Sequence, residues 1–156
     1  MLNIHIITVG KDKHSWVNDA VIHYAKLIKK YARLEISTIA EEKYNSATDI
    51  VKAKINEGER TTSRLKNGYV IALDLKGQTL NTVELADKFV FWQNHSISTL
   101  EFIIGGPFGL SDEIVRKADF ILNMSSLTMS HQIIRLALLE QLYRVLNINA
   151  GGSYHK

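Results

Sequence analysis

The fold prediction depends on residues 101–112, EFIIGGPFGLSD, where an apolar run stops abruptly at a glycine-rich turn. Leu100–Ile104 has the composition of a buried strand, and three of the nine glycines and the only proline follow it in Gly105–Gly109. Ser111 then stands where a helix N-cap is expected. A strand, a tight turn and a capped helix in this order form one unit of an α/β fold.

The same alternation of apolar strands and amphipathic helices extends along the rest of the chain. Strands are predicted at Leu2–Val9, Leu34–Ala40, Tyr69–Leu75, Leu100–Ile104 and Asp119–Met124. Helices are predicted at Trp16–Tyr31, Ala47–Lys66, Val83–Asn94, Asp112–Lys117 and His131–Asn147. We therefore expect an α/β fold with a mainly parallel sheet of five to six strands and helices on both faces. In such sheets ligands bind outside the carboxyl ends of the strands.

Length and composition narrow the class of protein. Since the chain has 156 residues, 46% of them hydrophobic, residues 1–156 are expected to form a single domain around one core. The chain has no cysteine, no apolar stretch long enough to span a bilayer and no basic leader before its first apolar run. We therefore expect a cytoplasmic protein without a membrane partner.

The net charge of +3 is unevenly distributed. Residues 1–66 carry twelve Lys and Arg against eight Asp and Glu, whereas the remainder carries seven against eight. A basic half is typical of a protein that binds a polyanion such as RNA, because contacts with phosphates release counterions. A solvated helix face explains the same charges equally well.

The last predicted helix, His131–Asn147, is apolar around most of its circumference. One face of a sheet does not cover so wide an apolar surface, so this helix should be buried on two sides. A second subunit is one candidate for the second side, with Leu138 in the seam, and we expect a homodimer. A central helix in the core of a monomer is the alternative.

The glycine-rich turn is the first candidate binding element. Glycine permits a positive φ and a close approach of a ligand to the backbone, and we expect Gly106 to need both. A phosphate-bearing nucleotide and an adenosine held by backbone groups both fit such a turn. Phosphate binding is disfavoured, because the dinucleotide fingerprint belongs in the first strand–helix turn and the Walker Gly-Lys-Ser/Thr is absent. A turn without any ligand is the structural alternative.

Two further segments lie at strand ends that a parallel sheet can bring next to this turn. Leu73 is near the end of the third strand, and Met124–Met129 lead from the fifth strand toward the last helix. Polar backbone groups, serine hydroxyls and methionine side chains suit a flat adenine and a thioether. The second segment also has a structural explanation, because Ser130 can cap the helix and His131 lies in its first turn.

Several motifs together resemble one family. They are GGPFGL (105–110), SSLTMSHQ (125–132), EQLYR (140–144) and YHK (154–156), with VGK (9–11) and LD (73–74) nearer the N-terminus. The combination spans nearly the whole chain and resembles the ribosomal RNA large subunit methyltransferase H family, of the SPOUT class.

This resemblance implies a C-terminal trefoil knot, an obligate dimer and S-adenosylmethionine as methyl donor. It also implies methylation of N3 of a pseudouridine in 23S ribosomal RNA, on the large subunit or the assembled ribosome. From the turn and the motifs together, the expected cofactor-binding residues are Leu73, Gly105, Gly106, Met124, Ser125, Ser126, Leu127, Thr128 and Met129.

The chain departs from the family pattern at three places. Phe108 stands where an acidic or small polar residue is common, Ser130 where a proline usually precedes the histidine, and Gly152-Ser153 where a His-Pro pair often precedes the terminal Tyr-His. Backbone-mediated cofactor binding should survive all three. The departures bear instead on the contacts with the substrate near the tail.

Methyl transfer to an imide nitrogen requires alignment of donor and acceptor, exclusion of water and loss of the N3 proton, and it requires no metal. His155 and Tyr154 are the candidates for positioning the base or moving this proton. Arg144 is the candidate for holding a phosphate or stabilising negative charge on the ring. We expect the tail that carries Tyr154 and His155 to fold over a cofactor pocket, with the pocket of a partner subunit as one possibility.

The remaining histidines are expected to be structural or exposed. His131 has the position of a backbone partner in the first turn of a helix, and no metal-ligand spacing links the others. The alternatives to the methyltransferase are a non-catalytic RNA-binding dimer, a nucleotide-dependent oxidoreductase and a SPOUT methyltransferase that acts on another RNA. The first does not explain the glycine-rich turn, and the second lacks its fingerprint.

Overall fold

The computed structural model describes residues 1–11 and 14–154, in which five strands and five helices alternate along the chain. The strands are β1 (Leu2–Val9), β2 (Ala32–Ile39), β3 (Tyr69–Thr79), β4 (Thr99–Ile104) and β5 (Phe120–Asn123). The helices are α1 (Ser15–Ile28), α2 (Ala47–Thr62), α3 (Thr82–Asn94), α4 (Asp112–Lys117) and α5 (His131–Asn149). The predicted alternation is confirmed, with boundaries shifted by a few residues at most elements.

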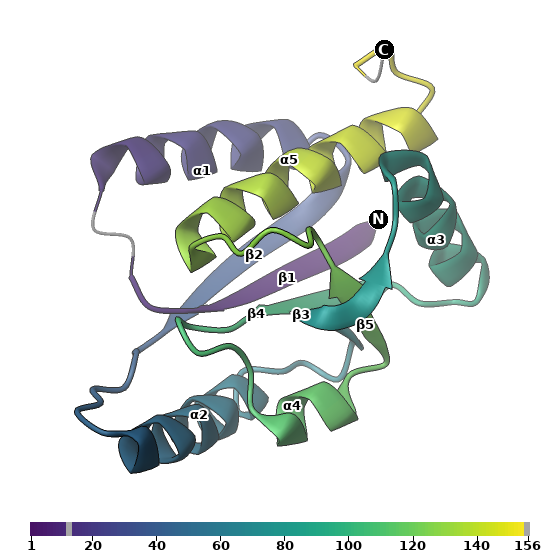
Figure 1. Cartoon of the computed structure of the whole chain (residues 1–156). Helices are drawn as coiled ribbons and strands as arrows, with labels where there is room; N and C mark the ends of the chain where they lie inside the picture. Colours follow the sequence, from purple (N-terminus) through teal and green to yellow (C-terminus); the bar gives the residue numbers. More distant parts are fainter. Residues whose placement is uncertain (12–13, 155–156) are drawn as a thin grey trace.

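The strands form one parallel sheet of order β2-β1-β4-β3-β5 (Figure 1). The ladder between β1 and β2 runs in register from Leu2 opposite Ala32 to Val9 opposite Ile39. The predicted parallel sheet is therefore confirmed. Because all strands point the same way, the loops that follow β3, β4 and β5 start at the same edge of the sheet.

Strand β3 is longer than predicted because it resumes pairing with β5 after a bulge. Leu73 and Gln78 both lie opposite Leu122, so residues 74–77 leave the ladder. At Gly77 the backbone passes so close to β5 that an added Cβ would lie 2.6 Å from the carbonyl oxygen of Ile121. Lys76 and Gly77 interrupt the apolar run, which is why the predicted strand ended at Leu75.

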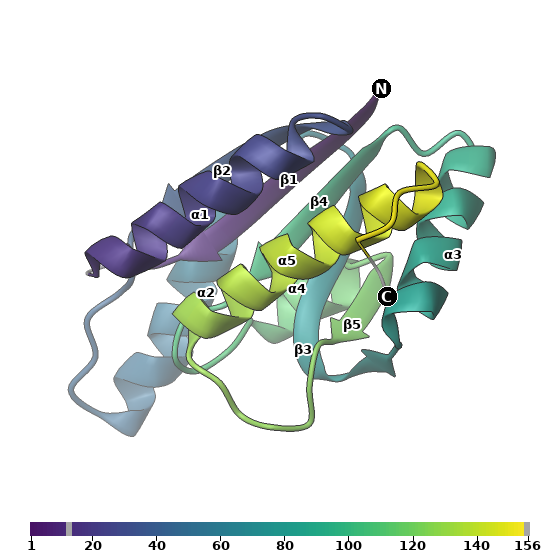
Figure 2. The same cartoon turned by 90° about the horizontal axis from the view of Figure 1, so that it is seen from above.

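Helices cover both faces of the sheet, as predicted. On one face α5 lies between α1 and α3, and on the other face lie α2 and α4 (Figures 1 and 2). The larger core fills the α1/α5/α3 face, where Phe89, Trp92 and Phe102 are among the largest fully buried side chains. Smaller apolar clusters around Val70 and Ile7 fill the opposite face.

The last helix is covered mainly by its own chain. Leu138 is fully buried in the core beneath α5, so its predicted place in a dimer seam is wrong. Helices α1 and α3, which flank α5, bury much of the apolar surface of α5 that the sheet leaves uncovered. Ile133, at 39% exposure, is an apolar side chain of this helix that faces outward. Within residues 1–11 and 14–154, no helix combines the length and apolar composition needed to cross a membrane.

A buried polar network lies on the α2/α4 face. Glu101 is fully buried and accepts hydrogen bonds from the backbone N–H groups of Lys66 and Gly68 at 2.9 and 2.7 Å. The Nδ1 of His5 lies 3.0 Å from the same carboxylate, and its Nε2 lies 2.8 Å from the hydroxyl of Ser37. His5 is thus a satisfied core histidine, which was one of the two roles expected for it.

Candidate functional site

The glycine-rich turn is a closed loop built by its own backbone. The N–H of Gly109 donates to the carbonyl of Gly106 at 3.0 Å, and Pro107 and Phe108 form the tip between them. Gly109 has a positive φ of 78°, whereas Gly106 has none, so the expected positive φ at Gly106 is wrong. Gly105 is required for space, since an added Cβ would lie 2.7 Å from the carbonyl carbon of Gly109.

A buried carboxylate of α2 lies beside the turn. Glu57 is 8% exposed, and its Oε1 accepts a hydrogen bond from the N–H of Glu42 at 2.9 Å. Its Oε2 lies 3.5 Å from the position that a Cβ of Gly106 would occupy. Burial, followed by repulsion from Glu41 and Glu42, raises the pKa of Glu57 above its ordinary value.

The unusual Phe108 has an apolar partner. Its ring packs edge-to-face against Tyr44, with ring centroids 4.5 Å apart. Tyr44 belongs to the segment between β2 and α2. The departure from the family pattern at this position therefore replaces a polar tip with an aromatic contact to a neighbouring loop.

The segment between β5 and α5 is shaped by short polar bonds. Asn123 accepts from the N–H of Ser125, and the Ser125 hydroxyl accepts from the N–H of Leu127, both at 3.0 Å. Ser126, Leu127 and Thr128 are exposed, with Leu127 at 74%. Ser130 caps α5 by accepting from the N–H of Ile133, so the structural explanation of this residue is confirmed.

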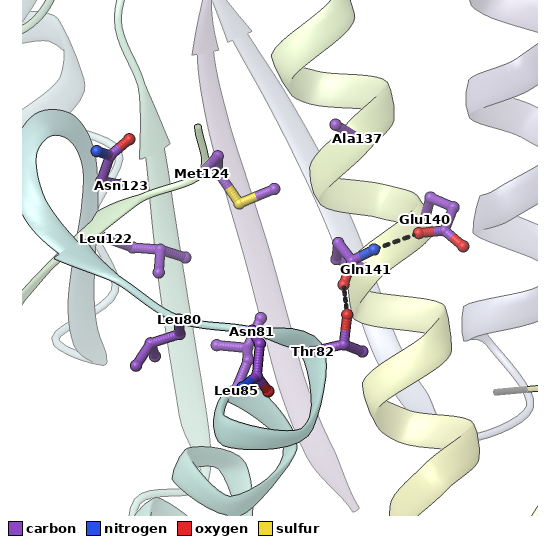
Figure 3. Close-up of a pocket in the computed structure, with 10 residues that line it drawn as sticks. All are labelled: Leu80, Asn81, Thr82, Leu85, Leu122, Asn123, Met124, Ala137, Glu140 and Gln141. Carbon is purple, nitrogen blue, oxygen red and sulfur yellow. Dashed lines mark hydrogen bonds between the residues drawn. The ribbon is translucent and has the colours of Figure 1, made fainter. Parts of the chain in front are cut away.

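A cavity of about 430 Å³ opens beside this segment, between β5, the start of α3 and the middle of α5 (Figure 3). It is lined by Leu80, Asn81, Thr82, Leu85, Leu122, Asn123, Met124, Ala137, Glu140 and Gln141. Of the predicted cofactor-binding residues, Met124 lines it, and its thioether points across the cavity toward α5. Leu73, Gly105 and Gly106 lie at the same sheet edge but outside this lining.

Most of the cavity lining was missed from the sequence. Asn81 begins α3 with a capping box that includes Glu84, and this pattern is readable in the sequence. Glu140 and Gln141 belong to the EQLYR motif, which enters the prediction only through the family resemblance. Thr82 and Gln141 are 59 residues apart in the sequence, but the Thr82 hydroxyl donates a hydrogen bond to Gln141 at 2.8 Å. No local feature of the sequence predicts that these two segments meet.

Arg144 and Tyr154 are brought together on the outer side of α5. The guanidinium carbon of Arg144 lies 4.6 Å from the centroid of the Tyr154 ring, which also packs against Tyr143. The N–H of Tyr154 donates to Asn147 at 2.9 Å. The tail turns back at Gly151, whose φ is 72°. In the single chain Tyr154 thus lies on its own α5, and His155 lies outside the described residues.

Arg144 is also held by Glu140, one turn earlier in α5. Its Nε and Nη2 donate to Oε1 of Glu140 at 2.9 and 2.5 Å. This hydrogen bond is the main cause that raises the pKa of Arg144 above its ordinary value. Burial, with Tyr154 and Glu140 nearby, raises the pKa of Tyr24 on α1. The tail residue thus lies in a cluster of polar side chains from α1 and α5.

Comparison with known proteins identifies the family. A family profile described as "Predicted SPOUT methyltransferase" matches residues 2–155. The chain belongs to the SPOUT methyltransferase family. A relative from Alkaliphilus oremlandii, named "Ribosomal RNA large subunit methyltransferase H", is 45% identical over 161 residues and covers 99% of this chain and 100% of its own. A relative of the same name from Bifidobacterium animalis subsp. lactis is 39% identical, with the same coverage.

A solved structure agrees with the fold of this SPOUT protein. A probable methylase family protein from Haemophilus influenzae superposes with a TM-score of 0.59, at 13% identity, over 99% of this chain and 71% of that one. At this identity the likeness supports the arrangement of strands and helices alone. The family resemblance expected from the motifs is confirmed, and the chain is a methyltransferase of that family.

Proposed function

We propose that this SPOUT methyltransferase transfers a methyl group from S-adenosylmethionine to N3 of a pseudouridine in 23S ribosomal RNA. One observation carries the proposal: the cavity of about 430 Å³ lies between Met124 and Glu140. Met124 begins the predicted cofactor segment, and Glu140 holds the predicted catalytic Arg144 and contacts Tyr154. The names of the two relatives supply the class of RNA.

The loops at the carboxyl edge of the sheet fit the proposed cofactor. The cavity has the size of a small-molecule site and offers a thioether, amides and apolar walls. We assign cofactor binding to Leu73, Gly105, Gly106 and the segment Met124, Ser125, Ser126, Leu127, Thr128 and Met129. Gly105 supports this assignment, because its lack of a Cβ keeps the turn closed at the end of β4. S-adenosylmethionine, when bound, supplies a methyl group on a positively charged sulfur.

The residues on α5 and the tail would handle the acceptor. Arg144 carries a cation that can stabilise negative charge on the pyrimidine ring or bind a neighbouring phosphate. Tyr154 and His155 would contact the base and hold or accept the N3 proton as the N3–methyl bond forms. In balance, the base exchanges its N3 proton for the methyl group, and the donor sulfur becomes a neutral thioether.

We propose that the protein acts in the cytoplasm as a homodimer, on the large subunit or the assembled ribosome. The basic N-terminal half suits an RNA partner. For the dimer, Ile133 is the better probe, because Leu138 lies in the core of the chain. Ile133→Glu should lower the dimer fraction in sedimentation without unfolding, whereas Leu138→Glu should unfold the chain. The single domain over residues 1–156 and the trefoil knot stay predictions.

Two measurements test the proposed function. In calorimetry, S-adenosylmethionine or S-adenosylhomocysteine should bind, whereas NAD and ATP should give no heat. Methylation assays would then offer assembled ribosomes, large subunits and free 23S RNA, with nucleoside mass mapping of the product. Binding without methylation of any RNA would favour the non-catalytic dimer, and a modified nucleotide elsewhere would favour another RNA substrate.

A further inference from the structure

Glu140 takes no direct part in the methyl transfer proposed above, although it connects the cavity with the tail. Its Oε1 accepts both hydrogen bonds from Arg144 and lies 3.4 Å from the Tyr154 hydroxyl, which donates to it. Its Oε2 accepts from Nε2 of Gln141 at 2.6 Å. Both oxygens therefore have partners, with Arg144 and Tyr154 at Oε1 and Gln141 at Oε2.

The Gln141 side extends the connection to α3. Oε1 of Gln141 accepts a hydrogen bond from the Thr82 hydroxyl at 2.8 Å, and all three side chains line the cavity (Figure 3). Thr82 is the first residue of α3, directly after the capping residue Asn81. Thr82 and Gln141, in the wall of the cavity, thus restrain the orientation of the Glu140 carboxylate independently of Arg144.

We propose that Glu140 is a positioning residue, which holds the Arg144 guanidinium and the Tyr154 hydroxyl at the edge of the cavity so that they meet the acceptor base. This inference rests on the proposed function. A carboxylate with two hydrogen bonds to one guanidinium is a strong restraint on a long, flexible side chain. The (i, i+4) order, with the acid nearer the N-terminus, is the favourable one on a helix.

The proposed role predicts a split between turnover and binding. Without Glu140, Arg144 keeps its positive charge and still attracts RNA, so the KM for ribosomes should stay within about 3-fold. Alignment of the acceptor is lost, so kcat should fall roughly 10- to 100-fold. The affinity for S-adenosylmethionine should stay within about 3-fold, because the cofactor is assigned to the loops at the sheet edge and to Met124, whereas Glu140 lines the opposite, α5 side of the cavity.

The variants for this test are Glu140→Ala and Glu140→Gln. The amide of Glu140→Gln still accepts a hydrogen bond, so its kcat should lie between those of wild type and Glu140→Ala. Asp87→Asn is the matched control, because it removes one negative charge from an exposed position of α3. A fall of kcat in Asp87→Asn equal to that in Glu140→Ala would show a general charge effect and overturn the proposal.

A double-mutant cycle with Arg144→Ala decides whether Glu140 acts through Arg144. If it does, adding Glu140→Ala to Arg144→Ala should lower kcat by less than about 3-fold further. Multiplying losses in this cycle and also in the same cycle with Tyr154→Phe would assign Glu140 a role of its own and refute the positioning role.

A structural readout separates this inference from the proposed function. In Glu140→Ala, the amides of residues 151–154 should exchange hydrogen faster, and the Arg144 Nε resonance should move toward that of a free guanidinium. A wild-type protein that methylates no RNA would defeat the proposed function while leaving this readout intact. Unchanged exchange and an unchanged Arg144 resonance would defeat the positioning role, whatever the activity of the wild type.

Discussion

The glycine-rich turn and the C-terminal tail are built in opposite ways. In the turn the backbone defines the shape. The N–H of Gly109 donates a hydrogen bond to the carbonyl of Gly106, and the backbone of Gly109 leaves no room for a Cβ at Gly105. In the tail side chains define the position of Tyr154, which rests on Tyr143 and Arg144. The turn should therefore tolerate changes of side chain but not of Gly105 or Gly109, whereas the tail should be sensitive to single side chains on α5.

This difference matches two separate tasks. Cofactor binding through backbone groups needs a rigid loop with little side-chain chemistry. Methyl transfer needs side chains that carry charge and protons to meet the acceptor. If the proposed function is right, damage to the turn should reduce binding, and damage to the tail should reduce turnover at unchanged binding.

Removal of residues 151–156 should have the largest effect on activity. Methylation of ribosomes should fall about 100-fold or more, because Tyr154 and His155 no longer align the acceptor. The affinity for S-adenosylmethionine, measured by calorimetry, should stay within a few-fold. Full activity of the truncated protein would show that the tail takes no part in the reaction.

A mixing experiment tests whether the tail serves its own subunit or the partner. The truncated chain would be combined with a full-length Gly105→Val chain, each inactive alone. If the site is shared between subunits, the mixed dimer should recover part of the activity. No recovery, with mixed dimers shown by mass spectrometry, would agree with the contact of Tyr154 with its own α5.

Gly105→Ala should be the most damaging single change in the turn. Its Cβ would lie 2.7 Å from the Gly109 carbonyl carbon and 2.9 Å from the Leu110 nitrogen, so the backbone must open. At about 1–3 kcal/mol for such overpacking, the affinity for S-adenosylmethionine should fall roughly 5- to 150-fold. Gly106→Ala is the control: its Cβ would lie 3.2 Å from a Val9 methyl group, and its φ is not positive, so a loss of a few-fold at most is expected. Equal losses would contradict a turn limited by backbone space at Gly105.

The sequence predicts the sheet and its helices well, for physical reasons. Apolar runs such as Leu2–Val9 match buried parallel strands, and caps such as Ser111 and Ser130 mark where helices begin. Local chemistry decides these features, so they can be read without knowledge of the fold. The bulge between Leu73 and Gln78 is different, because it depends on pairing with a distant strand.

The candidate site was predicted less completely. Met124 was expected, but Thr82 and Glu140 meet there only because α3 and α5 pack on one face. For the same reason Leu138 was placed in a seam, since hydrophobicity alone does not distinguish the core of a chain from an interface. At the glycines, the sequence predicts the need for freedom but not which residue takes the positive φ.

Phe108→Asp tests whether the side chain at the tip of the turn contributes to cofactor binding. The change restores the polar tip of the family pattern and removes the edge-to-face contact with Tyr44, which is worth about 0.5–1.5 kcal/mol. Because the backbone defines the turn, the affinity for S-adenosylmethionine should change by less than about 3-fold, while the melting temperature falls slightly. Tyr44→Ala removes the same contact and should lower the melting temperature similarly. A large loss of affinity in Phe108→Asp alone would place the side chain in the binding site.

Glu57→Gln should have the smallest effect. It tests whether the buried charge of Glu57, beside the turn, lowers the free energy of unfolding. Burial raises the pKa of Glu57 in the folded protein above its ordinary value of 4.5, so protonation stabilises the folded state relative to the unfolded state. The ionised form therefore destabilises the fold fully above the folded pKa and not at all well below 4.5. Gln keeps an acceptor for the Glu42 N–H, so Glu57→Gln should unfold at slightly higher urea than wild type at neutral pH. This gap should close as the pH falls below 4.5.

Asp49→Asn, on the same helix, provides a control of opposite sign. A hydrogen bond from the Asn45 N–H is the main cause that lowers the pKa of Asp49 below its ordinary value of 3.8. Its ionised form thus stabilises the fold above that value, and the stabilisation is lost as the pH falls through the lowered pKa. Asp49→Asn should therefore unfold at slightly lower urea than wild type at neutral pH, and the two should converge in acid. If both variants shift in the same direction at neutral pH, general charge repulsion rather than the burial of Glu57 beside the turn governs the stability of this face.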